Sequence, residues 1–292
     1  MIRRLAIIGI GLIGGSLALA LKRAGLTEQV VGAGRGQANL ALALANGVID
    51  ALAESPEAAA VGADVVVLAV PVGGMPALMA RIAPVMHDDM VLTDVGSTKQ
   101  DVVAAARTAL GVRVGQFVPA HPIAGAEASG VAAAHADLFR GKDVILTPLP
   151  ENPDAAVARV RAMWQGCGAR VETMTPLEHD RVFAAVSHLP HLAAFALMDE
   201  LAGRGNSALY FRHAGSGFRD FTRIAGSHPE MWRDIALANR EAVVAELDAY
   251  IDRLAHIRDL IATGDGDALM AALSRASQAR QQWAQDKLKT PR

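Results

Sequence analysis

The sequence predicts an α/β fold, with a doubly wound parallel-sheet domain over residues 1–173 and an all-helical domain over residues 174–292. Two observations support this division. From residue 5 to about 171, short β-branched apolar runs alternate with alanine-rich runs that are long enough for crossover helices. Beyond that point the β-branched runs stop and helical periodicity continues. Alternating strands and helices are typical of a parallel sheet that is covered by helices on both faces.

The individual elements follow from local patterns. Five runs are apolar on both faces, as buried parallel strands are, and they cover residues 6–10, 30–32, 65–70, 90–93 and 144–147. The helices predicted between them cover residues 16–24, 38–46, 75–82 and 99–110. In the second domain, Thr175-Pro176-Leu177-Glu178 forms a capping box and predicts a helix that continues to about Leu201. Ser227-His228-Pro229-Glu230 predicts a second helix start of the same kind.

The second half of the helical domain carries a line of apolar side chains at three- and four-residue spacing. We call it the apolar seam; its members are Val244, Leu247, Ile251, Leu254 and Ile261. Such a seam forms either the core of one helical domain or the contact surface of a homodimer. The sequence leaves both open.

Composition excludes several classes of function. The 292 residues include 28 Lys+Arg and 30 Asp+Glu, a net charge of −2, which argues against a nucleic-acid partner and against an anionic membrane surface. Cys167 is the single cysteine, so the chain cannot form an internal disulfide or a thiolate zinc site. Residues 5–21 resemble a signal sequence, but their glycines favour a strand and a helix, and no other stretch suggests a membrane span. We therefore expect a cytoplasmic protein.

The first strand leads into a glycine fingerprint, Gly9-Ile10-Gly11-Leu12-Ile13-Gly14. In a strand–turn–helix context, Gly9 makes the tight turn, Gly11 lets the backbone approach a pyrophosphate, and Gly14 allows close helix packing. The N–H groups at the helix start, including those of Leu12 and Ile13, favour an anion. The pattern predicts a dinucleotide site, which we expect Val70 to border from the end of the 65–70 strand.

The choice between NAD and NADP depends on the end of the second strand. An acidic residue that binds the ribose of NAD is usual there, about 20 residues after the fingerprint. This chain has small residues instead, followed by Arg35. Since an arginine attracts a 2′-phosphate that a carboxylate would repel, NADP is the preferred cofactor and NAD the alternative.

Two loops at the carboxyl edge of the sheet carry candidate catalytic groups. In Asp94–Lys99, the Ser97 hydroxyl either faces a substrate or serves as a helix N-cap with Gln100 three residues on. In residues 119–125, His121 ends a strand at the edge where ligands bind, and an imidazole there can exchange a proton with a substrate.

The helical domain adds histidines and arginines. His188 and His191 are three residues apart and could share a helix face, but no further ligand set accompanies them, so no metal site is predicted. Arg219 and Arg223 are four apart and would provide local positive charge for an anionic substrate. Either arginine could equally form a structural ion pair.

Taken in order, these motifs resemble the prephenate/arogenate dehydrogenase family of tyrosine biosynthesis. The fingerprint, Asp94–Lys99, His121–Gly125, Ser187–His191 and Phe218–Ala225 carry the resemblance over nearly the whole chain. It implies a Rossmann domain, a helical domain that forms a homodimer, and a small dianionic substrate bound between the two domains.

The resemblance also implies roles for single residues. His121 would accept the proton of the ring C4 hydroxyl, and Ser97 would bond that hydroxyl and orient His121. Arg223 would bind the ring carboxylate, and His191 would face the pyruvyl side chain. Further residues at positions that line or gate the family's pocket are His179, Glu127 and Trp232.

Alternatives remain within and outside this family. Prephenate is favoured over arogenate because an ammonium group would be better matched by a carboxylate than by His191; a cyclohexadienyl dehydrogenase of dual specificity is the alternative. Other fingerprint-bearing reductases commonly use a lysine of the second domain, yet no lysine lies between Lys142 and Lys287. A non-catalytic NADP sensor would require His121, His191 and Arg223 to be incidental.

Overall fold

The computed structural model describes residues 1–125, 128 and 130–289, with the side chains of 287–289 excepted. The chain forms two compact units, Met1–Arg240 and Glu241–Arg292, which are described separately. The predicted boundary between residues 173 and 174 falls inside the first unit.

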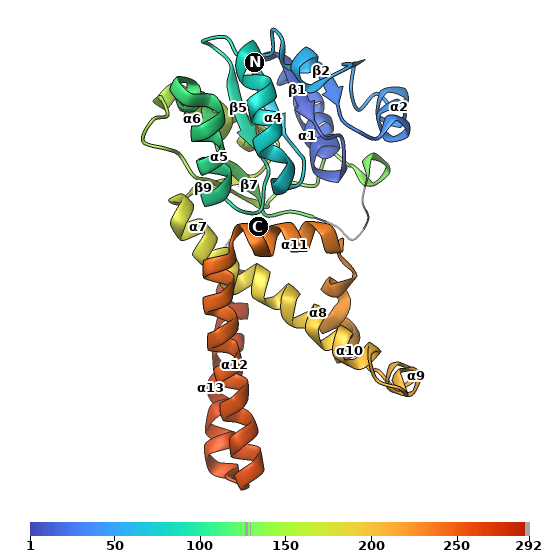
Figure 1. Cartoon of the computed structure of the whole chain (residues 1–292), viewed down its shortest axis with the longest axis vertical. Coiled ribbons are helices and arrows are strands. Elements are labelled where there is room, and N and C mark those ends of the chain that lie inside the picture. The colour runs from blue at the N-terminus through green and yellow to red at the C-terminus, as the bar shows by residue number, and fades with distance from the viewer. Residues whose placement is uncertain (126–127, 129, 290–292) are drawn as a thin grey trace. The chain divides into compact units, whose positions relative to one another are not determined.

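The first unit is built on a six-stranded parallel sheet in the order β3-β2-β1-β4-β5-β6 (Figure 1). The strands are β1 (Ile2–Ile8), β2 (Thr27–Ala33), β3 (Ala51–Leu52), β4 (Val65–Leu68), β5 (Val91–Asp94) and β6 (Phe117–Val118). From the centre of the sheet, β1, β2 and β3 follow one another toward one edge, and β4, β5 and β6 follow one another toward the other edge. The strand order therefore reverses between β1 and β4, and ligands bind at such a switch point, outside the carboxyl ends of the strands.

Helices cover both faces of this sheet. On one face, α1 (Leu12–Arg23), α2 (Gln37–Ala45) and α6 (Asp154–Gly166) contribute to one buried apolar cluster. On the other, α3 (Pro56–Ala60), α4 (Met75–Ile82) and α5 (Gln100–Leu110) contribute to a second. The doubly wound prediction is confirmed, and the stretch that resembled a signal sequence supplies β1 and α1 to the core.

A second, three-stranded sheet was not predicted. It contains β7 (Ala120–Pro122), β8 (Asp143–Leu146) and β9 (Arg170–Thr173), with β7 antiparallel and β9 parallel to β8. The expected strand at 144–147 is therefore real but lies in this sheet, not in the parallel one. Its apolar run indicated burial, and burial alone does not identify the neighbouring strand.

The helical part of the first unit begins as predicted. Thr175 Oγ1 accepts a hydrogen bond from the Glu178 backbone N–H at 3.2 Å, and the Glu178 carboxylate accepts one from Thr175 N–H at 2.9 Å. The helix continues through α7 (Pro176–Phe183), a π-helical turn (Ala184–His188) and α8 (Leu189–Ala202). The second predicted helix start is confirmed at Pro229, but its capping box is wrong, because Ser227 Oγ donates backwards to the Ile224 carbonyl at 2.7 Å.

Three shorter helices complete this unit: α9 (Ser207–Arg212), α10 (Ser216–Thr222) and α11 (Pro229–Ala238), with a 3₁₀ turn at Arg223–Gly226 before α11. The continuous helix Pro176–Ala202 is long and apolar enough to cross a membrane by length and composition alone, contrary to the expectation that no such stretch exists. Its first turns nevertheless hold His179 and Asp180, which are buried and bond residues at the sheet edge. Those contacts attach its first turns to the sheet edge, whereas 22% of the apolar window of the helix is buried.

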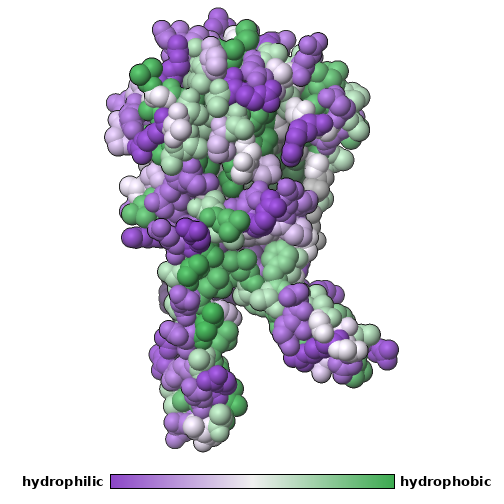
Figure 2. Space-filling model, viewed as in Figure 1, coloured by the Kyte–Doolittle hydropathy of each residue, from purple (hydrophilic) through white to green (hydrophobic). Residues whose placement is uncertain are grey.

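The second unit consists of the rest of α12 (Arg240–Thr263) and of α13 (Gly266–Lys289), joined by a turn at Gly264 with φ of +72°. The apolar seam lies on α12 and is not a core within the single chain. Val244, Ile251, Leu254 and Ile261 are each 48–61% exposed. Hydrophobic and polar surface alternate along the exposed helices in Figure 2.

Candidate active site

A buried ion pair fixes the strand that carries His121. The Lys99 ammonium is fully buried, donates to the Asp94 carboxylate at the end of β5, and also donates to the Ala120 carbonyl at 2.8 Å. The other oxygen of Asp94 accepts the Ala120 N–H at 3.1 Å. Both backbone groups of the residue before His121 are therefore held at the carboxyl edge of the parallel sheet.

His121 is the outer member of a chain of hydrogen bonds that we call the His121 cluster: His121, His179 and Asp180. His121 Nδ1 lies 2.8 Å from His179 Nε2, and His179 Nδ1 lies 2.8 Å from Asp180 Oδ1. Since a carboxylate only accepts, His179 Nδ1 carries a proton and its Nε2 accepts from His121 Nδ1–H. That assignment leaves His121 Nε2 with a free lone pair, as a general base requires.

Charges and burial in the cluster favour neutral imidazoles next to an ionised carboxylate. Burial raises the pKa of Asp180, but hydrogen bonds from His179 and from the backbone N–H groups of Gln100 and Lys99 outweigh it, so the pKa lies below its ordinary value. Burial, followed by the neighbouring His179 and Lys99, holds the pKa of His121 well below its ordinary value. Burial also lowers the pKa of His179. At neutral pH His121 is therefore unprotonated, as a general base must be before the reaction.

Asp180 also caps the start of α5, which the sequence did not indicate. Its two oxygens accept the Lys99 and Gln100 N–H groups at 2.8 Å each, at the start of α5. No side chain within α5 caps that helix. The alternative that Ser97 serves as an N-cap is therefore wrong, because a carboxylate from α7 satisfies those donors. Ser97 is half-buried, next to this helix start.

Three of the predicted substrate residues form a second group, the His191 cluster: His191, Trp232 and Arg223. The imidazole of His191 stacks on Trp232 with ring centroids 3.8 Å apart, and its Nδ1 bonds the Ser187 carbonyl at 2.9 Å. Burial and, less strongly, the charge of Arg223 lower the pKa of His191. Arg223 is exposed at the start of the 3₁₀ turn, whereas Arg219 lies one turn earlier on α10.

His188 and Asn239 lie between the two clusters. Asn239 Nδ2 donates to the Asp180 carbonyl at 2.7 Å and approaches His188 Nδ1 at 3.3 Å. Burial lowers the pKa of His188 to about 4. The sequence did not point to Asn239 or Asp180, because neither belongs to a spaced motif and the bonds that connect them to His188 and Lys99 span 51 and 81 residues.

Two predicted site residues need comment. His179 was expected to line the substrate pocket, but its side chain is completely buried behind His121. Its position indicates that it orients His121 and does not contact a ligand directly. Glu127 lies outside the described residues.

The glycine turn has the shape that a dinucleotide needs. A Cβ on Gly9, whose φ is +104°, would lie 2.3 Å from the Ala69 carbonyl oxygen, and one on Gly14 would lie 2.2 Å from the Gly9 oxygen. Around Gly11 there is open space, since a Cβ at that position would have no atom within 4 Å, and no side chain caps α1 there. Uncapped N–H groups beside open space can bind a phosphate.

The expected flanking residues occupy suitable positions. Val70 is half-buried, and its Cγ1 lies 3.0 Å from a Cβ placed on Gly9. Arg35 is exposed in the short link between β2 and α2. The turn, Val70 and Arg35 could thus hold a nucleotide along the sheet edge.

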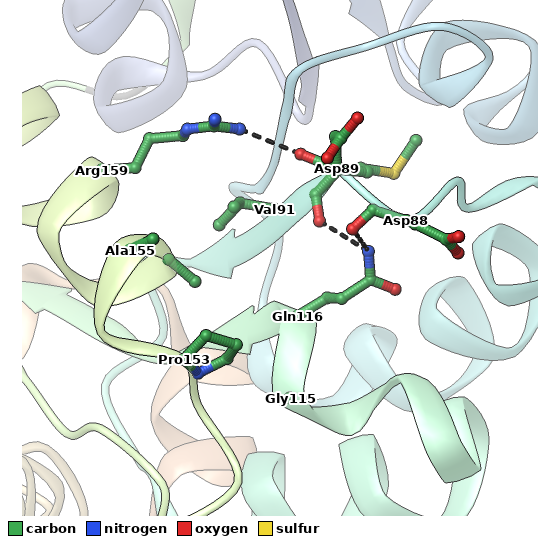
Figure 3. A pocket seen from close by; sticks show the side chains of 10 residues that line it. Asp88, Asp89, Val91, Gly115, Gln116, Pro153, Ala155 and Arg159 are labelled. Carbon is green, nitrogen blue, oxygen red and sulfur yellow. Dashed lines mark hydrogen bonds between the residues drawn. The ribbon is translucent and has the colours of Figure 1, made fainter.

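A pocket shown in Figure 3 lies at the opposite edge of the sheet, where β5 and β6 begin. Gln116 Nε2 there donates to the carbonyls of His87, Asp88 and Met90, and Arg159 donates to the Asp89 carbonyl. These hydrogen bonds satisfy the backbone carbonyls of the loop that leads into β5. None of the predicted site residues that the structure describes lines this pocket.

Comparisons with known proteins show the family to which the chain belongs. Family models for the prephenate dehydrogenase nucleotide-binding domain and dimerization domain match residues 17–173 and 175–275. The chain is 36% identical to a cyclohexadienyl dehydrogenase of Zymomonas mobilis over 95% of each chain. It is 38% identical to a prephenate dehydrogenase of Bacillus subtilis, over 93% of this chain and 74% of the other.

A solved structure gives the same result. Prephenate dehydrogenase from Aquifex aeolicus, in complex with hydroxyphenyl propionate and NAD⁺, superposes with a TM-score of 0.90 at 35% identity. The similarity covers 97% of this chain and 98% of that one.

Proposed function

This chain belongs to the prephenate dehydrogenase family, and from that premise we propose that it converts prephenate to 4-hydroxyphenylpyruvate and CO₂ with NADP⁺ or NAD⁺. The single observation that carries the proposal is the bonded chain from His121 through His179 to Asp180 at the sheet edge. It provides one unprotonated imidazole nitrogen with a fixed orientation.

The chemistry requires a hydride to leave ring carbon C4 and a proton to leave the hydroxyl group on that carbon. When bound, the nicotinamide supplies the hydride acceptor. His121 Nε2 takes the proton of the C4 hydroxyl, and the imidazolium that forms is stabilised through His179 by the ionised Asp180. The resulting ketone is conjugated with the two ring double bonds that flank the carboxylate-bearing carbon. As CO₂ leaves, the electron pair of the broken bond moves through the ring to the ketone oxygen, which takes a proton, and the ring becomes an aromatic phenol. Ser97 is proposed to bond the same hydroxyl.

Substrate recognition is assigned to the His191 cluster. Arg223 would bind the ring carboxylate, and His191, held flat against Trp232, would face the pyruvyl group. Burial keeps His191 neutral at pH 7, which suits a keto acid better than an ammonium group. The identity with a cyclohexadienyl dehydrogenase supports dual use of prephenate and arogenate as the second candidate.

We propose NADP⁺ as the preferred cofactor because Arg35 follows β2 where an acidic residue would otherwise repel a 2′-phosphate. The Aquifex relative binds NAD⁺. We further propose a cytoplasmic homodimer formed through the helical domain, since the apolar seam is exposed in the single chain and the matching family model describes a dimerization domain.

One experiment tests the cofactor and substrate assignments together. It measures kcat/KM with NADP⁺ and with NAD⁺, each in combination with prephenate and with arogenate. Fastest turnover with NADP⁺ and prephenate is expected. Preference for NAD⁺ would refute the assignment of Arg35, and preference for arogenate would refute that of His191. Nucleotide binding without turnover of either substrate would refute the enzymatic proposal and favour the sensor.

A further inference from the structure

Asn39, in the first turns of α2, makes two hydrogen bonds that join separate parts of the first unit. Its side-chain Nδ2 donates to the Ile10 carbonyl, inside the glycine turn, and its Oδ1 accepts the Val131 N–H at 2.9 Å. One neighbour is a carbonyl and the other an N–H, so only one orientation of the amide satisfies both. Asn39 is partly buried, and no motif of the sequence pointed to it.

The bond to Ile10 fixes the direction of a neighbouring donor. The described peptide bonds are trans, so the Ile10 carbonyl and the Gly11 N–H belong to one plane and point in opposite directions. With the carbonyl held toward Asn39, the Gly11 N–H points away from α2. Gly11 is the N-cap of α1 and has open space around it. The side chain of Asn39 thus sets the orientation of a peptide on which an anion would bind.

The bond to Val131 reaches the segment that follows the strand of His121. Val131 and Ala134 pack on Gly15, where a Cβ would lie 3.3 Å and 2.9 Å from their side chains. Ser16 Oγ accepts the His135 N–H at 3.0 Å. Asn39 and Ser16 therefore attach the same segment to α1 and α2, but only Asn39 also contacts the glycine turn.

We propose that Asn39 is a positioning residue for the cofactor, which acts by holding the Ile10–Gly11 peptide so that its N–H is available to the pyrophosphate. The proposal rests on the proposed function only in assuming that a dinucleotide binds at the glycine turn. It assigns Asn39 no part in proton transfer or in binding of the carboxylic acid substrate.

The test is direct calorimetric measurement of Kd for NAD⁺ and for NADP⁺, without substrate, in three variants. Asn39→Asp keeps the acceptor for Val131 but replaces the donor to Ile10 with a carboxylate, and is expected to weaken binding at least about 10-fold. Asn39→Ala loses both bonds and is expected to weaken it about 3- to 10-fold. Ser16→Ala loses only the attachment of the segment, and Kd should stay within about 2-fold.

A kinetic split provides the second measurement. In the Asn39 variants KM for the cofactor should rise, while kcat at saturating cofactor and its pH profile should stay near those of the unchanged protein. If Asn39→Ala does not fold, Asn39→Asp still tests the proposal, because it retains the bond to Val131. An unchanged Kd in folded Asn39→Asp, or an equal loss in Ser16→Ala, would overturn it. Because substrate is absent from the binding assay, failure of the dehydrogenase proposal would leave these results interpretable.

Discussion

The His121 cluster and the His191 cluster use the same kind of side chain in opposite ways. In the first, both nitrogens of His179 are bonded, its ring is buried, and the last carboxylate accepts two further backbone N–H groups. In the second, one nitrogen of His191 is bonded and the ring is held by stacking on Trp232, next to an exposed arginine.

This difference indicates a division of labour. A base needs one fixed tautomer and one direction for its lone pair, which hydrogen bonds on every inner nitrogen provide. A binding surface needs room for the ligand and a charge that remains accessible to it. Changes in the His121 cluster should therefore lower kcat, and changes in the His191 cluster should raise KM.

The largest effect is expected from His121→Asn, which removes the base without adding bulk. A general base contributes about 10²- to 10⁴-fold, so kcat should fall by that factor with a much smaller change in KM for prephenate. Steady-state kinetics at pH 7.5 with both cofactors measures kcat and KM in this variant. A kcat near that of the unchanged protein would remove His121 from the role of base.

Asp180→Asn tests whether the inner end of the chain sets the tautomer. The new amide can donate to His179 Nδ1, which reverses both bonds and leaves His121 Nε2 protonated and unable to act as a base. We expect kcat to fall by about 10²- to 10³-fold with KM for prephenate nearly unchanged. His191→Gln is the matched control from the other cluster, and there KM should respond more than kcat. A normal kcat in Asp180→Asn would contradict the proposal that the ionised Asp180 carboxylate sets the tautomer of His121.

The two clusters also differ in how much of each the sequence alone predicted. The parallel sheet, the glycine turn, His121 and the Thr175 capping box were predicted because each depends on local pattern: strand periodicity, spacing, or a cap three residues from its partner. Asp180 as the cap of α5, His179 behind His121, and the β7–β8 pairing were not predicted. Each depends on residues brought together across 20 or more positions, which periodicity does not encode.

A third prediction concerns His188, which lies between the clusters. Burial lowers its pKa to about 4 in the folded protein, against about 6.5 in an unfolded chain. Between these values the unfolded chain binds the proton more tightly, so the stabilising contribution is present above pH 6.5 and is lost as pH falls toward 4. The shift corresponds to roughly 3 kcal/mol at most. Urea unfolding at pH 7 and pH 4.5 measures the loss.

The matched variant for this prediction is His188→Gln, which removes the titrating ring. It should be less stable at pH 7 but should lose less free energy of unfolding between pH 7 and pH 4.5. If the two proteins lose the same amount, the acid sensitivity comes from other groups, among them His121 and His179, whose pKa values burial also lowers.

The smallest of these effects is expected at Arg223, because its charge is exposed and water partly replaces it. Arg223→Ala should raise KM for prephenate about 10- to 100-fold, since a hydrogen bond to a charged group is worth about 1.5–3 kcal/mol, and kcat at saturation should change little. Arg219→Ala, one turn away on α10, is the control and should leave KM nearly unchanged. If kcat falls instead while KM stays constant, Arg223 acts on the transition state, and the division between a cluster for chemistry and a cluster for binding would no longer hold.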